Sequence, residues 1–459
     1  MVDKAVQKKW LTDWHPEDTE AWERDGRRLA RRNLIASVIT EHVGFSVWTL
    51  WSVLVLFMSP RTGFGLDAGE KFLLVAVPTV VGALLRLPYG HAVTRYGGRD
   101  WTVFATLILL VPAGLALYFV GRPGTPLWVY LLIGATAGVG GGTFASSMTN
   151  ITALYPRRHQ GWALGLNAGG GNLGVAAVQL VGLAVIAAAG MDHPAYVAAV
   201  YVPLIAAAAW LAGRTMDNVA AVRGAAGAHR QAVRDRDTWY LCLLYIGTFG
   251  SFIGYGFAFG LVLQSEFGAT PVEAVGYTFL GPLLGSCSRP LGGRLADLLG
   301  GARVTFWNFL GMAAGTLGLV LAAHAKSFPL FVACFIVLFV LSGLGNGSTY
   351  KMIPALFAAK AEKQITDGLD ATRAFARARK LSGSVIAIAG AAGALGGAAI
   401  NLAFKVSYSG DSGSGTPAFL TFLCYYALCM VVLRAVYLRR SSPHERPSPA
   451  DRTRETRRV

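Results

Sequence analysis

Two arginines lie at equivalent positions in the two halves of this 459-residue chain, each within an apolar segment. Arg86 lies in FLLVAVPTVVGALLRLPYG and Arg289 in YTFLGPLLGSCSRPLGG, and neither segment contains an acid. A guanidinium inside a membrane costs at least about 2.5–3.5 kcal/mol on insertion scales, so each arginine needs a partner or a watery cavity. A single such arginine could extend to the interface or bond structurally to carbonyls. A symmetric pair favours recognition of an anion, because guanidinium donors form a planar fork.

The segments that follow the two arginines are also repeated. Glycine-rich runs occur at 138–148 (GVGGGTFASSM) and 343–353 (GLGNGSTYKMI), and basic Gly-Gly turns at 90–99 (GHAVTRYGGR) and 293–303 (GRLADLLGGAR). The first turn has Thr94 where the second has Asp297. A membrane chain that repeats itself at half its length is typical of a transporter whose site lies where the halves meet.

Composition places these elements in a bilayer. The chain is 54% hydrophobic and 14% charged, with 56 glycines and a mean hydropathy of +0.47. Such long apolar runs predict an all-α membrane protein whose glycines let helices approach closely. Twelve transmembrane helices are expected, at 34–58, 72–93, 101–121, 127–154, 160–189, 195–214, 238–264, 273–296, 303–323, 327–357, 381–405 and 416–438.

The formal net charge of +16 is distributed unevenly. Basic residues concentrate in the first 33 residues, at 215–237, at 360–380 and after Leu438, whereas the alternate loops are nearly bare. This asymmetry predicts a multi-pass protein of the cytoplasmic membrane with both termini in the cytoplasm. Anionic lipid headgroups are a sufficient partner for the charge, and no nucleic acid is expected.

Five segments are expected along the chain. They are a cytoplasmic N-terminal segment (1–33), a first six-helix bundle (34–214), a cytoplasmic linker (215–237), a second six-helix bundle (238–438) and a disordered cytoplasmic tail (439–459). The polar first segment is no cleavable signal peptide, so the first span is expected to direct insertion. The loop at 358–380 is expected to form a short amphipathic helix.

The run at 138–174 closely resembles the signature of nitrate/nitrite porters of the NarK type, a branch of the major facilitator superfamily. The segments 343–357 and 388–397 resemble the second signature of the same family, and the two Gly-Gly turns resemble the superfamily's loop motif. Further agreement comes from TDWHPED (12–18), FSVW (45–48), LLYIGTFGSFIG (243–254) and GARVT (301–305). The resemblance implies the major facilitator fold, with twelve helices in two pseudo-symmetric bundles. Thr143 departs from it, since the family more often has Asn there, and selectivity could be altered.

The resemblance also implies a binding site for nitrate or nitrite between Arg86 and Arg289. Aromatic residues expected to wall this site, with two asparagines nearby, are Phe45, Phe144, Tyr245, Phe249, Asn167 and Asn172. A flat, weakly hydrated anion suits a dry slot between rings, although any one of these rings taken alone would more often be lipid-facing or core. Glycines expected to let the bundles rock are Gly140, Gly142, Gly169, Gly170, Gly171, Gly345, Gly347, Gly390 and Gly393. Tight helix packing with no ligand role is the alternative for most of them.

Two ionisable residues are candidates for proton coupling or gating. Glu41, four residues before Phe45, shares its helix face and would line the same cavity. Lys351 is expected at a similar depth in the tenth span, where it would lie opposite Glu41 as its partner. Both could instead be hydrated and silent in the cytoplasmic vestibule. An acid in an anion cavity would repel the substrate, so Glu41 is interpreted as a carrier that takes up a proton as nitrate enters.

The function predicted is secondary transport of nitrate and/or nitrite by a rocking-bundle mechanism, as a monomer. Proton–nitrate symport is favoured, nitrate/nitrite antiport is the alternative, and transport of another small anion is more remote. No metal cluster, nucleophile–base pair or nucleotide loop occurs in the sequence. The chain is therefore not expected to be an enzyme, to need a cofactor or metal, or to be driven by ATP. A channel or sensor would need an uninterrupted pore or a soluble domain, and the sequence offers neither.

Overall fold

The computed structural model describes residues 10–58, 60–220, 228–410 and 413–439. Apart from one parallel pair of two-residue strands, β1 (Trp10–Leu11) and β2 (Asn218–Val219), the described structure is helical. The first half contains α1 (Thr19–Ala21), α2 (Arg27–Trp48), α3 (Trp51–Phe57), α4 (Ala68–Tyr96), α5 (Gly98–Leu107), α6 (Leu110–Phe119), α7 (Leu127–Ala137), α8 (Val139–Leu154), α9 (Arg157–Ala189) and α10 (Ala195–Thr215). The second half contains α11 (Ala228–Arg234), α12 (Arg236–Tyr245), α13 (Ser251–Phe267), α14 (Pro271–Thr278), α15 (Leu280–Leu299), α16 (Gly301–His324), α17 (Phe328–Thr366), α18 (Ala371–Ser409) and α19 (Thr416–Val432). Short π-helical or 3₁₀ turns occupy Trp22–Gly26, Pro60–Thr62, Ile246–Gly250 and Leu433–Leu438.

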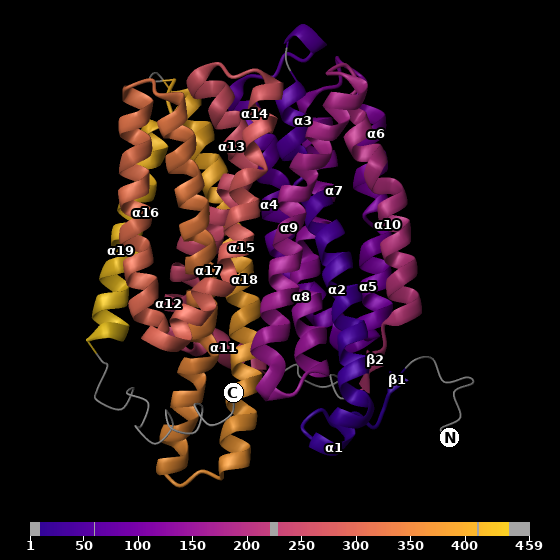
Figure 1. The fold of residues 1–459 in the computed structure, drawn as a ribbon, viewed down its shortest axis with the longest axis vertical. Helices are drawn as coiled ribbons and strands as arrows, with labels where there is room; N and C mark the ends of the chain where they lie inside the picture. The colour runs from indigo at the N-terminus through magenta and orange to yellow at the C-terminus, as the bar shows by residue number, and fades with distance from the viewer. Residues whose placement is uncertain (1–9, 59, 221–227, 411–412, 440–459) are drawn as a thin grey trace.

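The two halves stand side by side as bundles of roughly parallel and antiparallel helices (Figure 1). They meet along α4 with α18 and along α9 with α15. The strand β1 and the last turn of α19 lie at the same end of the molecule, at the bottom of Figure 1, which we call the β1 end. The expected tail lies almost wholly outside the described residues, as do parts of the N-terminal segment and of the linker.

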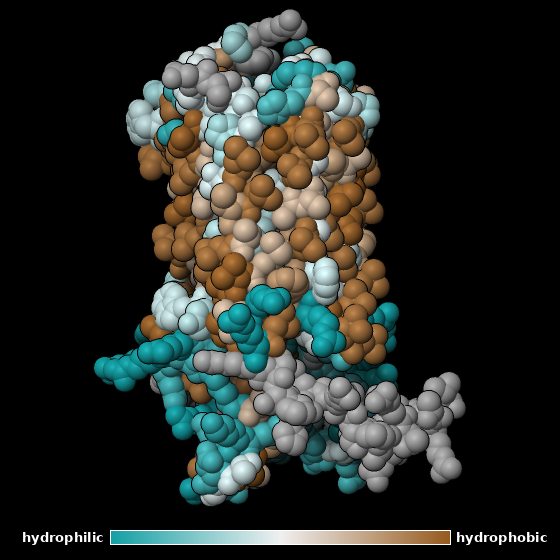
Figure 2. Space-filling view, turned by 90° about the vertical axis from the view of Figure 1, so that its left-hand side faces the viewer, coloured by the Kyte–Doolittle hydropathy of each residue, from teal (hydrophilic) through white to brown (hydrophobic). Residues whose placement is uncertain are grey.

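On the face shown in Figure 2, apolar residues cover the middle of the molecule and polar residues gather toward both ends. Eleven helical segments of the described chain are long and apolar enough to cross a membrane. The twelfth expected span, 273–296, corresponds to α14 and α15, which run through the bundle with the others (Figure 1). This span is not among the eleven apolar segments because three of the twenty residues of α15 are charged, namely Arg289, Arg294 and Asp297.

The polar loop expected at 358–380 is replaced by helix. The helix α17 continues to Thr366 and α18 begins at Ala371, so the two project together beyond the β1 end (Figure 1). The expectation of a separate short helix was wrong, because Ala, Lys and Arg at 358–380 are good helix formers that extend both spans.

The two Gly-Gly turns have the same structure in both halves. Gly97 and Gly300 adopt positive φ values of 92° and 88°, which only glycine tolerates easily. A Cβ on the following Gly98 would collide with Asn150 of α8, and one on Gly301 would lie 2.7 Å from Met352 of α17. The repeat seen in the sequence is therefore a repeat in space, in which each turn brings the start of the following helix (α5 or α16) against a glycine-rich helix (α8 or α17).

Candidate functional site

Arg86 is completely buried at the junction of the two halves. Its Nε donates to the carbonyl of Gly141 on α8 (3.3 Å), and its Nη1 donates to the carbonyl of Gly390 on α18 (2.7 Å). The Nη2 atom has no partner among the described residues. Arg86 therefore links the halves through its bond to Gly390. Both of these bonds go to neutral carbonyls, and one donor group is left open.

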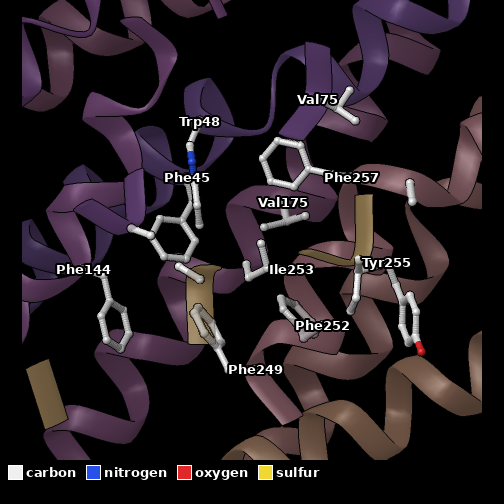
Figure 3. Packing of buried hydrophobic residues seen from close by; sticks show 14 of the residues in the cluster. Phe45, Trp48, Val75, Phe144, Val175, Phe249, Phe252, Ile253, Tyr255 and Phe257 are labelled. Carbon is white, nitrogen blue, oxygen red and sulfur yellow. The ribbon is translucent and has the colours of Figure 1, made fainter. Parts of the chain in front are cut away.

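Aromatic rings enclose the Arg86 guanidinium. Its Cζ lies 4.6 Å from the ring centre of Phe144, 4.9 Å from that of Phe249 and 5.7 Å from that of Trp48. The rings of Phe144 and Phe249 are stacked with centres 6.0 Å apart, and Phe45 lies 6.3 Å from Phe144 (Figure 3). Ring faces stabilise a cation while excluding water, so this cluster gives Arg86 a dry, aromatic environment.

A π-helical turn, Ile246–Gly250, brings Tyr245 and Phe249 to the same place. Their rings stack with centres 5.2 Å apart and an angle of 15°. Wide turns of this kind inside α-helices frequently occur at functional sites, because they redirect side chains. Tyr245 is buried, and its hydroxyl lies beside the Arg289 guanidinium.

Arg289 occupies the corresponding position in the second half and is 4% exposed. Its Cζ lies 5.5 Å from the ring centre of Tyr350, whose ring is in turn 6.4 Å from that of Tyr245. Neither the Nη1 of Arg289 nor the Tyr350 hydroxyl has a partner in the described part of the chain. Tyr245 stacks on Phe249, which adjoins Arg86, and lies beside Tyr350, which adjoins Arg289. The two guanidinium groups therefore flank one cluster of rings.

A cavity of about 700 Å³ leads from the β1 end to Arg289 and Tyr350. Its walls come from both halves, namely the first turns of α9 and the β1-end portions of α15, α17 and α18. At the opposite end the halves are in contact, because Phe72 of α4 stacks on Phe404 (5.5 Å) and Tyr408 (5.4 Å) of α18. The site is therefore approached from one end of the molecule and closed at the other.

Glu41 lies in a polar cluster inside the first half. It is 1% exposed, and its Oε2 accepts hydrogen bonds from the Ser147 hydroxyl and from Asn167 Nδ2, the latter at 2.7 Å. Its Oε1 has no partner among the described side chains. Glu41 lies one helical turn before Phe45 on α2, and its partner Ser147 lies one turn after Phe144 on α8, so the carboxyl adjoins the ring cluster.

Lys351 does not pair with Glu41, contrary to the expected opposition of the two residues. Its Nζ lies 2.9 Å from a carboxylate oxygen of Asp297 on α15, and both side chains are partly exposed at the cavity wall. The pairing fails because Glu41 is held inside the first half by Ser147 and Asn167, whereas Lys351 on α17 lies against α15 of its own half. Asp297, assigned only to the loop motif, is the partner that was missed.

The remaining expected site residues are distributed as follows. Phe45, Phe144, Tyr245 and Phe249 surround Arg86 or adjoin that group, as described above. Asn167 binds the Glu41 carboxylate and the Ser147 hydroxyl rather than an arginine. Asn172 on α9 is buried, and neither of its amide atoms has a partner in the described residues. Thr143, the departure from the family pattern, bonds its own helix at the Gly140 carbonyl (2.6 Å).

Most of the expected conformational glycines pack helices within one half. A Cβ added at any of six of these glycines would contact a residue of the same half. The glycines and the residues they would contact are Gly140 with Gly44, Gly142 with Tyr89, Gly170 with Val38, Gly171 with Glu41, Gly345 with Asn308 and Gly347 with Arg289. Gly390 differs, because its Cβ would lie 3.2 Å from Arg86 Nη1 and 3.4 Å from Phe144 across the junction. Gly393 faces Tyr245 and Phe249, and the space around Gly169 is open.

Gly393→Ala is expected to lower the thermal unfolding temperature of the purified protein. The new methyl would lie 2.9 Å from ring atoms of both Tyr245 and Phe249, and overpacking of this kind costs about 1–3 kcal/mol. Gly169→Ala is the matched control on α9, since no atom lies within 4 Å of its added Cβ. Thermal unfolding followed by intrinsic fluorescence compares the two, and equal unfolding temperatures would contradict the packing at Gly393.

Three residues of the arrangement were not singled out from the sequence. They are Trp48, which adjoins the Arg86 guanidinium, Tyr350, which adjoins Arg289, and Ser147, which binds Glu41. Tyr350 and Ser147 lie inside the two glycine-rich runs and Trp48 inside FSVW. A polar or aromatic residue within a repeated glycine run is a signal that could have identified two of them.

Comparison with known proteins agrees with this architecture. The Major Facilitator Superfamily pattern matches residues 43–400. The nitrate/nitrite transporter NarU of Escherichia coli is 37% identical over 454 residues, which cover 94% of this chain and 96% of NarU. The probable nitrate/nitrite antiporter NarK2 of Thermus thermophilus is 35% identical over 379 residues, which cover 77% of this chain and 84% of NarK2.

Solved structures support the fold alone. A D-xylose-proton symporter superposes with a TM-score of 0.64 at 16% identity, covering 87% of this chain and 96% of the symporter. The family pattern spans most of the chain, and NarU is similar to it along nearly its whole length. This multi-pass membrane protein belongs to the major facilitator superfamily, in the nitrate/nitrite porter family that includes NarU.

Proposed function

We propose that this protein is a secondary transporter of nitrate and nitrite that holds the anion between Arg86 and Arg289. The observation that carries the proposal is the pair of buried guanidinium groups, one from each half, each with a donor that no described residue occupies. The names of the relatives, nitrate/nitrite transporters and antiporters, supply the identity of the anion.

The chemistry of the pocket fits a planar monovalent oxyanion. The open Nη2 of Arg86 and Nη1 of Arg289 can each donate a charge-assisted hydrogen bond to an oxygen of such an anion, while the faces of Phe144 and Phe249 exclude water. Phosphate and sulfate carry more charge and hold their hydration shells more strongly, so a dry slot between rings disfavours them. Tyr245 and Tyr350 add neutral hydroxyl donors beside Arg289.

Transport follows from alternating access to this site. The cavity reaches Arg289 from the β1 end, and Phe72 with Phe404 and Tyr408 closes the other end. Together with the concentration of basic residues at the same end, this supports a cytoplasmic location of both termini and an inward-facing state. The two bundles, 34–214 and 238–438, would rock about the arginine pair, and the junction at Gly390 would separate and re-form.

Coupling to protons is the finer part of the proposal. Glu41 is a buried carboxyl that interacts electrostatically with both arginines. One of its own oxygens, Oε1, has no partner in the described structure. An anion that enters beside a carboxylate is repelled, and a proton on Glu41 removes the repulsion. This arrangement favours proton–nitrate symport, and exchange of nitrate for nitrite is the alternative that the name of NarK2 supports.

Nitrate and nitrite are expected to raise the thermal unfolding temperature of the purified protein, whereas chloride, sulfate and phosphate are not. A ligand at a hundred times its Kd stabilises the native state by about 2.7 kcal/mol, a shift of a few degrees. The measurement is a melting series in detergent at constant ionic strength, with each anion as its sodium salt. Equal shifts with all five anions would contradict a selective oxyanion site.

A further inference from the structure

The helix α17 carries a buried amide that no element of the transport site yet explains. Asn346 is completely buried, and neither its Oδ1 nor its Nδ2 has a partner among the described residues. Native folds pair nearly all buried polar groups, so a fully buried amide that is left unpaired points to a role beyond folding.

The position of Asn346 on α17 directs it toward the site. It lies seven residues after Phe339 and four before Tyr350, so the three share one helix face. The ring of Phe339 lies 6.2 Å from that of Phe252, and the ring of Tyr350 lies 6.4 Å from that of Tyr245. Since Tyr245 and Phe252 bracket Phe249 along the neighbouring chain segment, Asn346 faces this segment at the level of Phe249.

The other faces of α17 are already occupied. An added Cβ on Gly347 would meet the backbone of Arg289 on α15, and Ser348 bonds Thr305 of α16 at 2.8 Å. The side chain of Asn346 therefore points in the one remaining direction, toward the rings that enclose the Arg86 guanidinium.

Two other described asparagines have both amide atoms unpartnered, Asn150 and Asn172. Asn150 lies against Gly98 at the first turn of α5, at the β1 end and away from the arginines. Asn172 belongs to the site already expected from the sequence. Asn346 is thus the unassigned amide whose helix face contacts the site.

We propose that Asn346 donates a hydrogen bond to an oxygen of the anion held between Arg86 and Arg289, and that it favours nitrate over nitrite. The inference rests on the proposed function. Nitrate has three oxygens and nitrite has two. The open donor groups, Nη2 of Arg86 and Nη1 of Arg289, can each bind one oxygen, which leaves one oxygen of nitrate for a further donor. A neutral amide serves that oxygen without adding charge that would also strengthen binding of nitrite.

The test compares the affinities of Asn346→Leu for nitrate and for nitrite. Leucine has nearly the shape of asparagine and no donor. The control is Asn308→Leu, because Asn308 is also buried in the second half but lies against Gly345 on another face of α17. Both anions are titrated calorimetrically into the purified full-length protein.

We expect Asn346→Leu to raise the Kd for nitrate by about tenfold or more, as for a lost hydrogen bond to a charged group, and the Kd for nitrite by less than threefold. Asn308→Leu is expected to change neither. Unchanged nitrate affinity, or equal weakening for both anions, would overturn the inference while leaving the proposed function intact. Absence of nitrate binding by the unsubstituted protein would refute the proposed function itself.

If Asn346→Leu does not fold, Asn346→Asp supplies a second test. A carboxylate of the same shape at this position would repel the anion, and nitrate binding should be lost at neutral pH and partly restored in acid. Nitrate affinity equal to that of the unsubstituted protein would show that this side chain does not face the anion.

Discussion

Proteoliposomes that carry Arg86→Lys or Arg289→Lys are expected to take up nitrate at less than about 1% of the unsubstituted rate. Each substitution keeps the positive charge but removes a planar fork, and hydrogen bonds to a charged group contribute about 1.5–3 kcal/mol each. At position 86 a lysine would also lose the bonds to Gly141 and Gly390 that hold the group between the halves. Lysine is therefore not a conservative replacement at either position.

The control for these variants is Arg294→Lys. Arg294 lies five residues after Arg289 on α15, is exposed and lines the cavity. If replacing any arginine on this helix, or any arginine that contributes to the electrostatic potential of the cavity, impaired transport, all three variants would take up nitrate more slowly. We expect Arg294→Lys to transport at a near-normal rate. Near-normal uptake by either Arg86→Lys or Arg289→Lys would show that the pair does not jointly hold the anion.

The residues predicted for the centre of the site lie together in the structure, whereas those predicted for its periphery do not. The internal repeat pointed to Arg86 and Arg289, and both guanidinium groups adjoin the ring cluster that contains Tyr245, Phe249 and Tyr350. Repetition is informative here because two copies of one bundle must meet on a shared axis. The aromatic residues followed from the family resemblance and not from their spacing, since rings are common throughout a membrane helix.

The periphery was harder to predict because it depends on which helix each side chain packs against. Lys351 faces α15, where Asp297 binds it, and Glu41 is held by Ser147 and Asn167 inside the first half. Likewise, Tyr350 was read as part of a glycine run, although its ring packs beside Arg289. Hydropathy locates the apolar part of a helix, but a helix that leaves the membrane continues as long as its residues favour helix.

The glycines show a different limit of sequence reasoning. Both copies of the run suggested flexible contacts between moving bundles, yet most of these positions pack helices inside one bundle. Small residues are needed for close packing in membranes whether or not the helices move. A glycine that contacts the opposite half, as Gly390 does, can be distinguished from one that only packs helices within its own half. This distinction requires the three-dimensional structure.

Glu41→Gln is expected to abolish accumulation of nitrate driven by an inward proton gradient and to spare exchange of nitrate across the membrane without a gradient. Glutamine has the shape of a protonated glutamic acid and accepts the same bonds from Ser147 and Asn167 through its carbonyl. It cannot release a proton, so the variant remains permanently in the state that admits an anion. Loading would then no longer require a proton from either side.

The measurement uses two assays on the same proteoliposomes, accumulation of labelled nitrate after an acid jump outside, and counterflow with nitrate inside at equal pH. Glu266→Gln serves as the control, because Glu266 is also a buried acid but binds Tyr408, Gly415 and Lys326 at the end remote from the cavity. That variant should keep both activities. If Glu41→Gln still concentrates nitrate under the gradient, Glu41 is not the coupling group. If the unsubstituted protein accumulates nitrate only when nitrite is present inside, whatever the gradient, the protein is an antiporter and the charge of Glu41 has another use.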